Sequence, residues 1–118
     1  MTGSQFVYKI AGASEWLAAL ASGRYEGSAA DRRDGFVHLS AGHQVAGTLA
    51  RHFATKKNLV LIAFRAADCG PSLAWEALRN GKLFPHLYGA LDPQRAIWVR
   101  AIGDAGGGHH LPRLEPET

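Results

Sequence analysis

The chain has 118 residues, of which 47% are hydrophobic and 19% charged, with a formal net charge of +3. This size and composition predict one domain with its own core, and the single Cys69 excludes an intramolecular disulfide, which favours a reducing compartment. Dispersed basic residues argue against nucleic acid, and no secretory signal or membrane-length apolar run is found, so we expect a cytoplasmic protein with a small anionic ligand.

The first predicted elements are a strand and a helix. Residues 6–10 are rich in β-branched and aromatic side chains and predict the first strand. A helix is expected to follow, with Ser14 as its N-cap and Gly23 at its end. Its predicted apolar stripe consists of Trp16, Leu17 and Leu20.

The middle of the chain predicts a loop, two strands and a helix. The polar, charged stretch 24–34 predicts the loop and 35–40 the second strand. Apolar residues then return at helical spacing in 45–53, with Ser40 available to cap that helix. The continuous apolar run 58–64 predicts a central strand buried on both faces.

The last third of the chain is dominated by predicted strands. Segments 73–78 and 82–88 flank Asn80-Gly81, a dipeptide typical of tight hairpin turns, and 96–102 predicts a final strand. With about six strands and two helices, the expected fold is α+β with a compact, mixed, mostly antiparallel sheet. Residues 1–102 are expected to form the single domain, and the glycine-rich 103–118 a flexible tail.

Strand alternation brings two histidines to candidate positions. Successive side chains of a strand point to opposite faces, so His38 and Ser40 share one face while Val37 and Leu39 face the core. In the later segment the residues expected to share a face are Phe84, His86 and Tyr88. The sequence therefore predicts a pocket built by 35–40 and 83–89, the alternative being polar residues on an exposed sheet face.

Trp75, Glu76 and Arg33 are further candidates. Only one of Trp75 and Glu76 can enter the pocket of a regular strand, and Glu76 is either a general base or a partner of Arg79 or Lys82. One arginine of the charged cluster 31–34, Arg33 in particular, is a candidate phosphate clamp; a solvated ion-pair cluster is the alternative. The histidines lack zinc-motif spacing, so we expect no metal.

Several segments together resemble domain-of-unknown-function family 952. They run in order from residue 6 to 102, and the most specific are DGFVHLS (34–40) and LFPHLYG (83–89). The resemblance implies a split, ADP-ribosyltransferase-like sheet with a cleft for a nicotinamide dinucleotide, so NAD is the candidate cofactor.

That resemblance also implies positions for the ligand. Tyr8 or Lys9 would contact the dinucleotide, Tyr88 or Trp75 would stack on the nicotinamide, and Glu76 or His86 would hold a ribose hydroxyl. The usual His-Tyr-Glu and Arg-Ser-Glu sets are missing. The expected function is therefore an NAD- or nucleotide-utilising transferase or glycohydrolase with His38, Glu76 and His86 as catalytic residues, or a non-catalytic module binding a nucleotide or another anionic metabolite.

Overall fold

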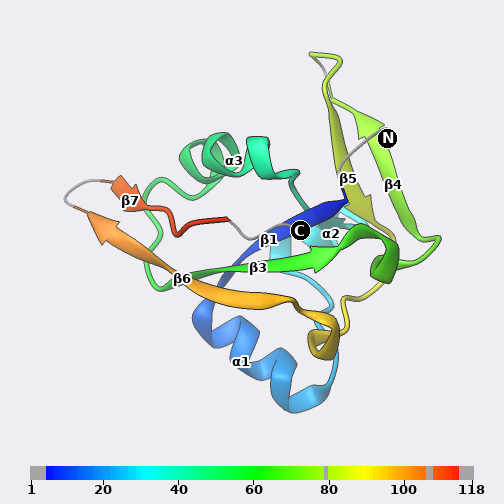
Figure 1. Cartoon of the computed structure of the whole chain (residues 1–118), viewed down its shortest axis with the longest axis horizontal. Helices are drawn as coiled ribbons and strands as arrows, with labels where there is room; N and C mark the ends of the chain where they lie inside the picture. Colours follow the sequence, from blue (N-terminus) through cyan, green and yellow to red (C-terminus); the bar gives the residue numbers. More distant parts are fainter. Residues whose placement is uncertain (1–4, 79, 106–107, 115–118) are drawn as a thin grey trace.

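Two antiparallel sheets form the framework of the protein in a computed structural model that describes residues 5–78, 80–105 and 108–114 (Figure 1). The four-stranded sheet has the order β1-β3-β6-β7, formed by Phe6–Gly12, Leu59–Arg65, Trp98–Ala105 and Gly108–His110. The three-stranded sheet has the order β2-β5-β4, formed by Val37–His38, Leu83–Leu87 and Leu73–Ala77. The α+β class and the mostly antiparallel pairing are as expected.

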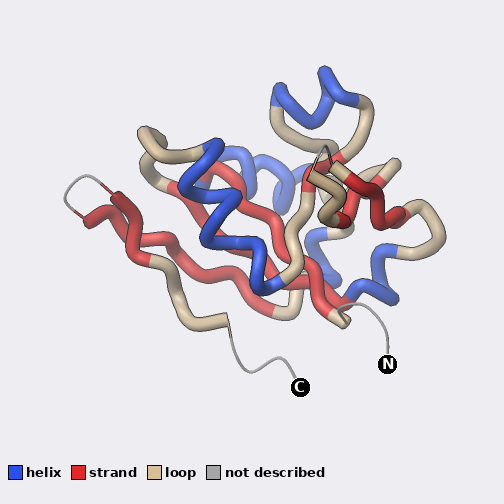
Figure 2. The backbone as a smooth tube through the Cα atoms, turned by 90° about the horizontal axis from the view of Figure 1, so that it is seen from above, coloured by secondary structure: helices blue, strands red, loops and turns tan. Residues whose placement is uncertain are grey.

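Two helices cover opposite faces of the four-stranded sheet. The three α-helices are α1 (Ala13–Ser22), α2 (Ala29–Asp34) and α3 (Val45–His52). Short 3-10 turns occur at Gly42–Gln44, Ala66–Cys69 and Pro93–Arg95. Figure 1 shows α1 and α3 on either side of β1, β3 and β6, and in Figure 2 α3 crosses over the strands. None of the helices in the described part of the chain has the length and apolarity needed to span a membrane.

Strand alternation divides the core into two clusters. One face of β1 and β3 packs with Trp16 and Ala19 of α1, and the other with Val45 and Leu49 of α3. β3 is therefore covered on both faces, which explains its continuous apolar sequence and confirms it as a central strand. Burying such side chains stabilises the fold by about 1.5–3 kcal/mol each.

The first helix differs from its prediction in two ways. Gly12, not Ser14, is the N-cap, and Glu15 accepts a hydrogen bond from the Gly12 amide at 3.1 Å. Leu17 and Leu20 are 65% and 51% exposed, so the expected apolar stripe was wrong apart from Trp16. Ala19 faces the core instead, because the helix lies close to the sheet and a small side chain fits there. The predicted stop at Gly23 is confirmed.

Other helices and strands also begin or end at residues that differ from the predicted ones. The predicted loop 24–34 contains α2, whose start is stabilised by a capping box between Ser28 and Asp31. β2 is only two residues long, and the predicted hairpin of β4 and β5 is confirmed. β6 continues to Ala105, and β7 pairs with its last three residues, so the first part of the predicted tail belongs to the sheet. The flexibility of the tail stays a prediction, and its residues 106–107 and 115–118 lie outside the described residues.

The two sheets are joined where β2 ends. Ser40 exchanges two backbone hydrogen bonds with Tyr8 of β1, at 2.8 and 2.9 Å, and the Leu39 amide donates to Pro85 of β5 at 3.0 Å. The chain therefore leaves β2 and pairs with the other sheet within two residues. This junction places β1 beside the histidine-bearing strands.

Candidate functional site

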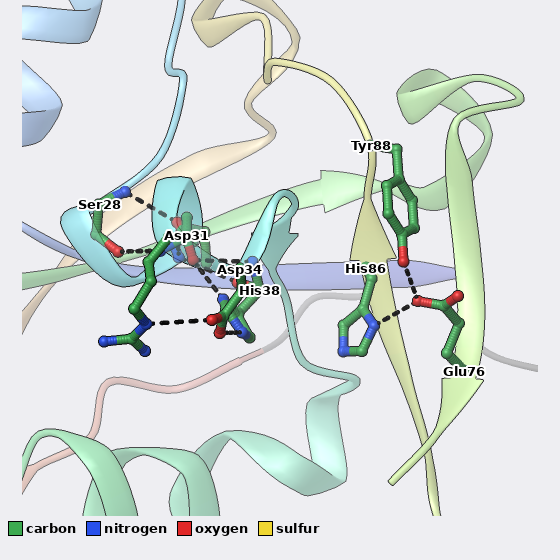
Figure 3. A network of polar contacts seen from close by, with 9 residues as sticks. Ser28, Asp31, Asp34, His38, Glu76, His86 and Tyr88 are labelled. Atoms are coloured by element: carbon green, nitrogen blue, oxygen red, sulfur yellow. Dashed lines mark hydrogen bonds and ion pairs between the residues drawn. The ribbon is translucent and has the colours of Figure 1, made fainter.

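The two predicted histidines lie opposite each other on neighbouring strands. His38 of β2 pairs with His86 of β5 in antiparallel register, and their ring centroids are 5.8 Å apart. Figure 3 shows both rings directed to the same side of these strands. Val37 and Leu39 are buried in the core, as predicted. Alternation along the strands thus brings the two imidazoles together from positions 48 residues apart in the sequence.

Asp31 anchors the first half of the site. Its Oδ1 lies 2.6 Å from Nδ1 of His38 and accepts from the His38 amide at 3.1 Å. Its Oδ2 accepts from Nζ of Lys9 at 2.8 Å and from the Ser28 amide at 3.0 Å. Lys9, Asp31, Asp34 and His38 are called the His38 group below. The Ser28-x-x-Asp31 capping pattern was the sequence signal that could have identified Asp31 as ordered.

The Lys9–Asp31 pair is almost completely buried. The two side chains are 4% and 2% exposed, and Lys9 also donates to the His38 carbonyl at 3.1 Å. Burial would raise the pKa of Asp31, but the hydrogen bond with His38 and the Lys9 ammonium together hold it below its usual value. Asp31 is therefore a carboxylate at neutral pH, and it fixes the orientation of the His38 ring.

Asp34 contacts the other nitrogen of the same ring. Its Oδ2 lies 3.0 Å from Nε2 of His38, and its Oδ1 accepts from Nε of Arg33 at 3.2 Å. The hydrogen bond from Arg33 is the main cause that lowers the pKa of Asp34. Both contacts of His38 are hydrogen bonds only when both ring nitrogens carry protons. The two carboxylates thus hold the His38 ring at both of its nitrogens.

Glu76, His86 and Tyr88, called the His86 group below, form the second half of the site. Oε1 of Glu76 lies 2.7 Å from Nδ1 of His86 and accepts from the Tyr88 hydroxyl at 2.7 Å. The hydrogen bond from Tyr88, and then that from His86, lowers the pKa of Glu76, while the carboxylate raises the pKa of Tyr88. Glu76 therefore enters the site, and Arg79, one of its alternative partners, lies outside the described residues.

Phe36 packs between the two groups, a contact that sequence reasoning missed. Its ring stacks on His86 with centroids 4.0 Å apart and lies 4.6 Å from His38 and 5.3 Å from Tyr88. Phe36 lies two residues before His38, so alternation along a strand puts it on the same face, but it gives no sign that the Phe36 ring joins the two histidines. An open cavity of about 250 Å³ adjoins it, lined by Arg24, Glu26, Asp31, Arg32, Gly35, Phe36, Val37, Gly89 and Ala90.

Several predicted ligand contacts are buried away from this face. Tyr8 is 1% exposed in the core, and Ser40 is buried with its hydroxyl 3.0 Å from that of Thr48. Trp75 packs against the core because it faces away from Glu76 on β4. Lys9 is occupied by Asp31. In this structure Tyr8, Lys9 and Ser40 are buried and Trp75 is half-buried, and the ligand contacts expected of them stay predictions.

Of the remaining predicted residues, His86 is buried, His38 and Glu76 are half-buried, and Arg33 and Tyr88 are exposed. Tyr88 is 49% exposed and Arg33, although paired with Asp34, is exposed and does not line the cavity. Within the described ranges no three His, Cys, Asp or Glu side chains are grouped so that they could hold a metal ion. Histidine side chains can donate and accept protons, so the arrangement offers two imidazoles, each held by a carboxylate, beside the aromatic ring of Phe36.

The comparisons with known proteins give a family and a fold. Residues 10–99 match the model of a family described as a protein of unknown function, DUF952. The crystal structure of protein CC0527 from Caulobacter crescentus is 47% identical, with a TM-score of 0.83 over 88% of this chain and 92% of that one. The solution NMR structure of CC0527 is 44% identical, with a TM-score of 0.78 over 90% of this chain and 91% of that one. No curated protein matches.

Proposed function

Because the chain belongs to the family of proteins of unknown function DUF952, we propose its function from its own geometry: it is an enzyme in which His86 transfers a proton to or from a nucleotide substrate. NAD is the first substrate to test, in a transferase or glycohydrolase reaction. The single observation that carries the proposal is the Glu76–His86 contact, with its second imidazole nitrogen left open.

The hydrogen bond with Glu76 selects the tautomer of His86. The carboxylate accepts from Nδ1, so Nε2 of the neutral ring is unprotonated and can act as a base. The side chain is only 8% exposed, and Nε2 has no hydrogen-bond partner among the described residues. This nitrogen is nevertheless not one of the fully buried polar atoms that lack a partner, so solvent can reach it. A desolvated imidazole held by a carboxylate is suited to general acid–base catalysis, which contributes about 10²–10⁴-fold to rate.

His38 supplies the charge beside this base. Its ring is held in place by Asp31 and Asp34, and when protonated it would stabilise an anionic group bound near His86. In hydrolysis of NAD, the bond between the ribose C1′ and nicotinamide breaks with its electron pair leaving on nicotinamide. The oxygen of water bonds to C1′, and His86 accepts the proton that water releases.

An ADP-ribosyltransferase-like fold is part of this proposal. The division into a four-stranded and a three-stranded antiparallel sheet supports it, since that fold has a split sheet. The site itself departs from the usual residue sets of such transferases, because Tyr8 and Ser40 are buried. The reaction is therefore assigned to the histidine pair and not to a transferred triad.

A non-catalytic binding module is the second candidate. It is favoured by the two occupied nitrogens of His38 and by the Phe36 ring that covers one face of His86. Both features hold the histidines rigidly, as expected of a site that recognises a ligand without turning it over. The same ligand would then bind without release of nicotinamide.

The enzyme and the binding module can be distinguished by amide NMR titration with NAD and with ADP-ribose. Free nicotinamide is measured in the same samples. The enzyme requires saturable shifts around His38 and His86 and nicotinamide release that falls at least about 10²-fold in His86→Ala. His52→Ala, an exposed histidine on α3, is the matched control and should leave both unchanged. Binding without nicotinamide favours the module. Absence of shifts at millimolar ligand would contradict both.

A further inference from the structure

We propose that the cavity beside Phe36 binds a phosphate group, held by the guanidinium of Arg32 and the backbone amides of Gly89 and Ala90. The inference deepens the proposed function by naming the part of the site that holds the phosphate of its substrate. It rests on that function only for the reaction that follows binding. The cavity is formed where the C-terminal part of α2 faces the segment that follows β5.

The charges that line the cavity are balanced except for one. Arg24 donates to Glu26 at 3.1 Å, so these two side chains neutralise each other. Asp31 is neutralised by Lys9 from the core side. Arg32 lines the same cavity and has no ion pair within the part of the chain that the structure describes. The cavity therefore carries one uncompensated positive charge, and a guanidinium binds phosphate oxygens in a bidentate manner.

Two backbone amides of the residues that line the cavity lack acceptors in the described ranges. The amide of Tyr88 donates to Ser72 at 3.0 Å, and that of Leu91 donates to Tyr25 at 2.9 Å. Between them, the amides of Gly89 and Ala90 donate to no acceptor in the described ranges. Both residues line the cavity. Amide donors beside a cationic side chain are the usual partners of a phosphate oxygen.

The size of the cavity indicates that it holds one part of a larger ligand. Its volume of about 250 Å³ lies below the range of roughly 300–1,000 Å³ typical of small-molecule sites. Phe36 lines the cavity and also stacks on His86 at 4.0 Å. A ligand anchored here by its phosphate would therefore extend across Phe36 towards the open Nε2 of His86.

Arg32 replaces the arginine that the sequence suggested. Arg33 follows it on α2, and neighbouring residues of a helix point about 100° apart. Arg33 is turned away from the cavity lining and pairs with Asp34 at 3.2 Å. Both arginines are exposed on the same helix, so they form a matched pair in which only one faces the proposed phosphate.

The test is an amide NMR titration with inorganic phosphate and with ADP-ribose at constant ionic strength, using chloride and adenosine as controls. Wild-type protein should show saturable shifts at Gly89 and Ala90 with both phosphate compounds. Arg32→Gln should weaken both affinities about tenfold or more, whereas Arg33→Gln should change them less than about twofold.

Equal losses in the two variants, or shifts that avoid Gly89 and Ala90, would overturn the inference. Saturable binding of phosphate by the wild-type protein, without release of nicotinamide from NAD, would support the phosphate site and count against the enzyme. Turnover of NAD that depends on His86 but not on Arg32 would support the enzyme and count against the phosphate site. The two proposals therefore fail separately.

Discussion

Replacing Asp31 with Asn is expected to destabilise the protein strongly. The carboxylate is 2% exposed and pairs with an ammonium that is 4% exposed, and it also receives hydrogen bonds from His38 and Ser28. In Asp31→Asn the charge is lost, so Lys9 stays buried without a counter-ion. Breaking a buried ion pair by removing one partner costs about 3–5 kcal/mol. At about 4 °C per kcal/mol for a chain of this size, the melting temperature should fall by about 12–20 °C.

Urea unfolding at pH 7, followed by the fluorescence of the buried Trp16 and by circular dichroism, measures this loss. The control is Asp34→Asn, whose more exposed carboxylate should contribute far less to stability because solvent screens its contacts. Replacing both partners, in Lys9→Met with Asp31→Asn, should recover much of the loss because no unpaired charge remains. If Asp31→Asn is no less stable than Asp34→Asn, or the double variant is as unstable as the single one, the assignment of a stabilising buried pair is refuted.

Three further effects are expected. In the folded state the pKa of Asp31 lies below its unfolded value of about 3.9, since His38 and Lys9 outweigh the effect of burial. The stabilisation by this carboxylate is thus present above that pH and is lost as the pH falls further. The urea midpoint should therefore depend less steeply on acid pH in Asp31→Asn than in the wild-type protein. Gly27→Ala should lower the melting temperature more than Gly35→Ala, because both have positive φ but only at Gly27 would a Cβ lie 2.6 Å from Cβ of Asp31. Burial, and to a smaller extent the charge of Asp68, raises the pKa of the Cys69 thiol to about 11. Labelling of Cys69 with a maleimide should therefore be slow at pH 7 and accelerate towards pH 11. Fast labelling at pH 7 would contradict the raised pKa.

Local patterns predicted the strands well because their signals are strong. The β-branched run of β1, the apolar run of β3 and the Asn80-Gly81 turn each agree with the pairing found in the structure. Alternation along two such strands was sufficient to place His38 and His86 on one face and Val37 in the core. It could not choose between Trp75 and Glu76, because only the register against β5 sets which of them faces His86.

The missed features depend on contacts distant in sequence. α2 is six residues long and its only buried side chain is Asp31, so it has no apolar stripe to predict it. Asp31 is held by Lys9, 22 residues earlier, a contact that no local pattern contains. Ser40 seemed to share the face of His38, but β2 ends at His38 and the chain then pairs with Tyr8 of β1, which buries Ser40.

The two halves of the candidate site also differ in when they can form during folding. The members of the His86 group all lie within 13 residues of one hairpin, 76–88, whereas the His38 group joins α2 and β2 to β1. Contacts between near neighbours close short loops and form early, while distant pairings carry a larger entropic cost and form later. We therefore expect Glu76 to engage His86 as soon as the hairpin closes, and Asp31 to engage Lys9 only after β1 has paired with β3. A partly folded chain would hold the contacts of the His86 group but not those of the His38 group, which confines a complete candidate site to the fully folded protein.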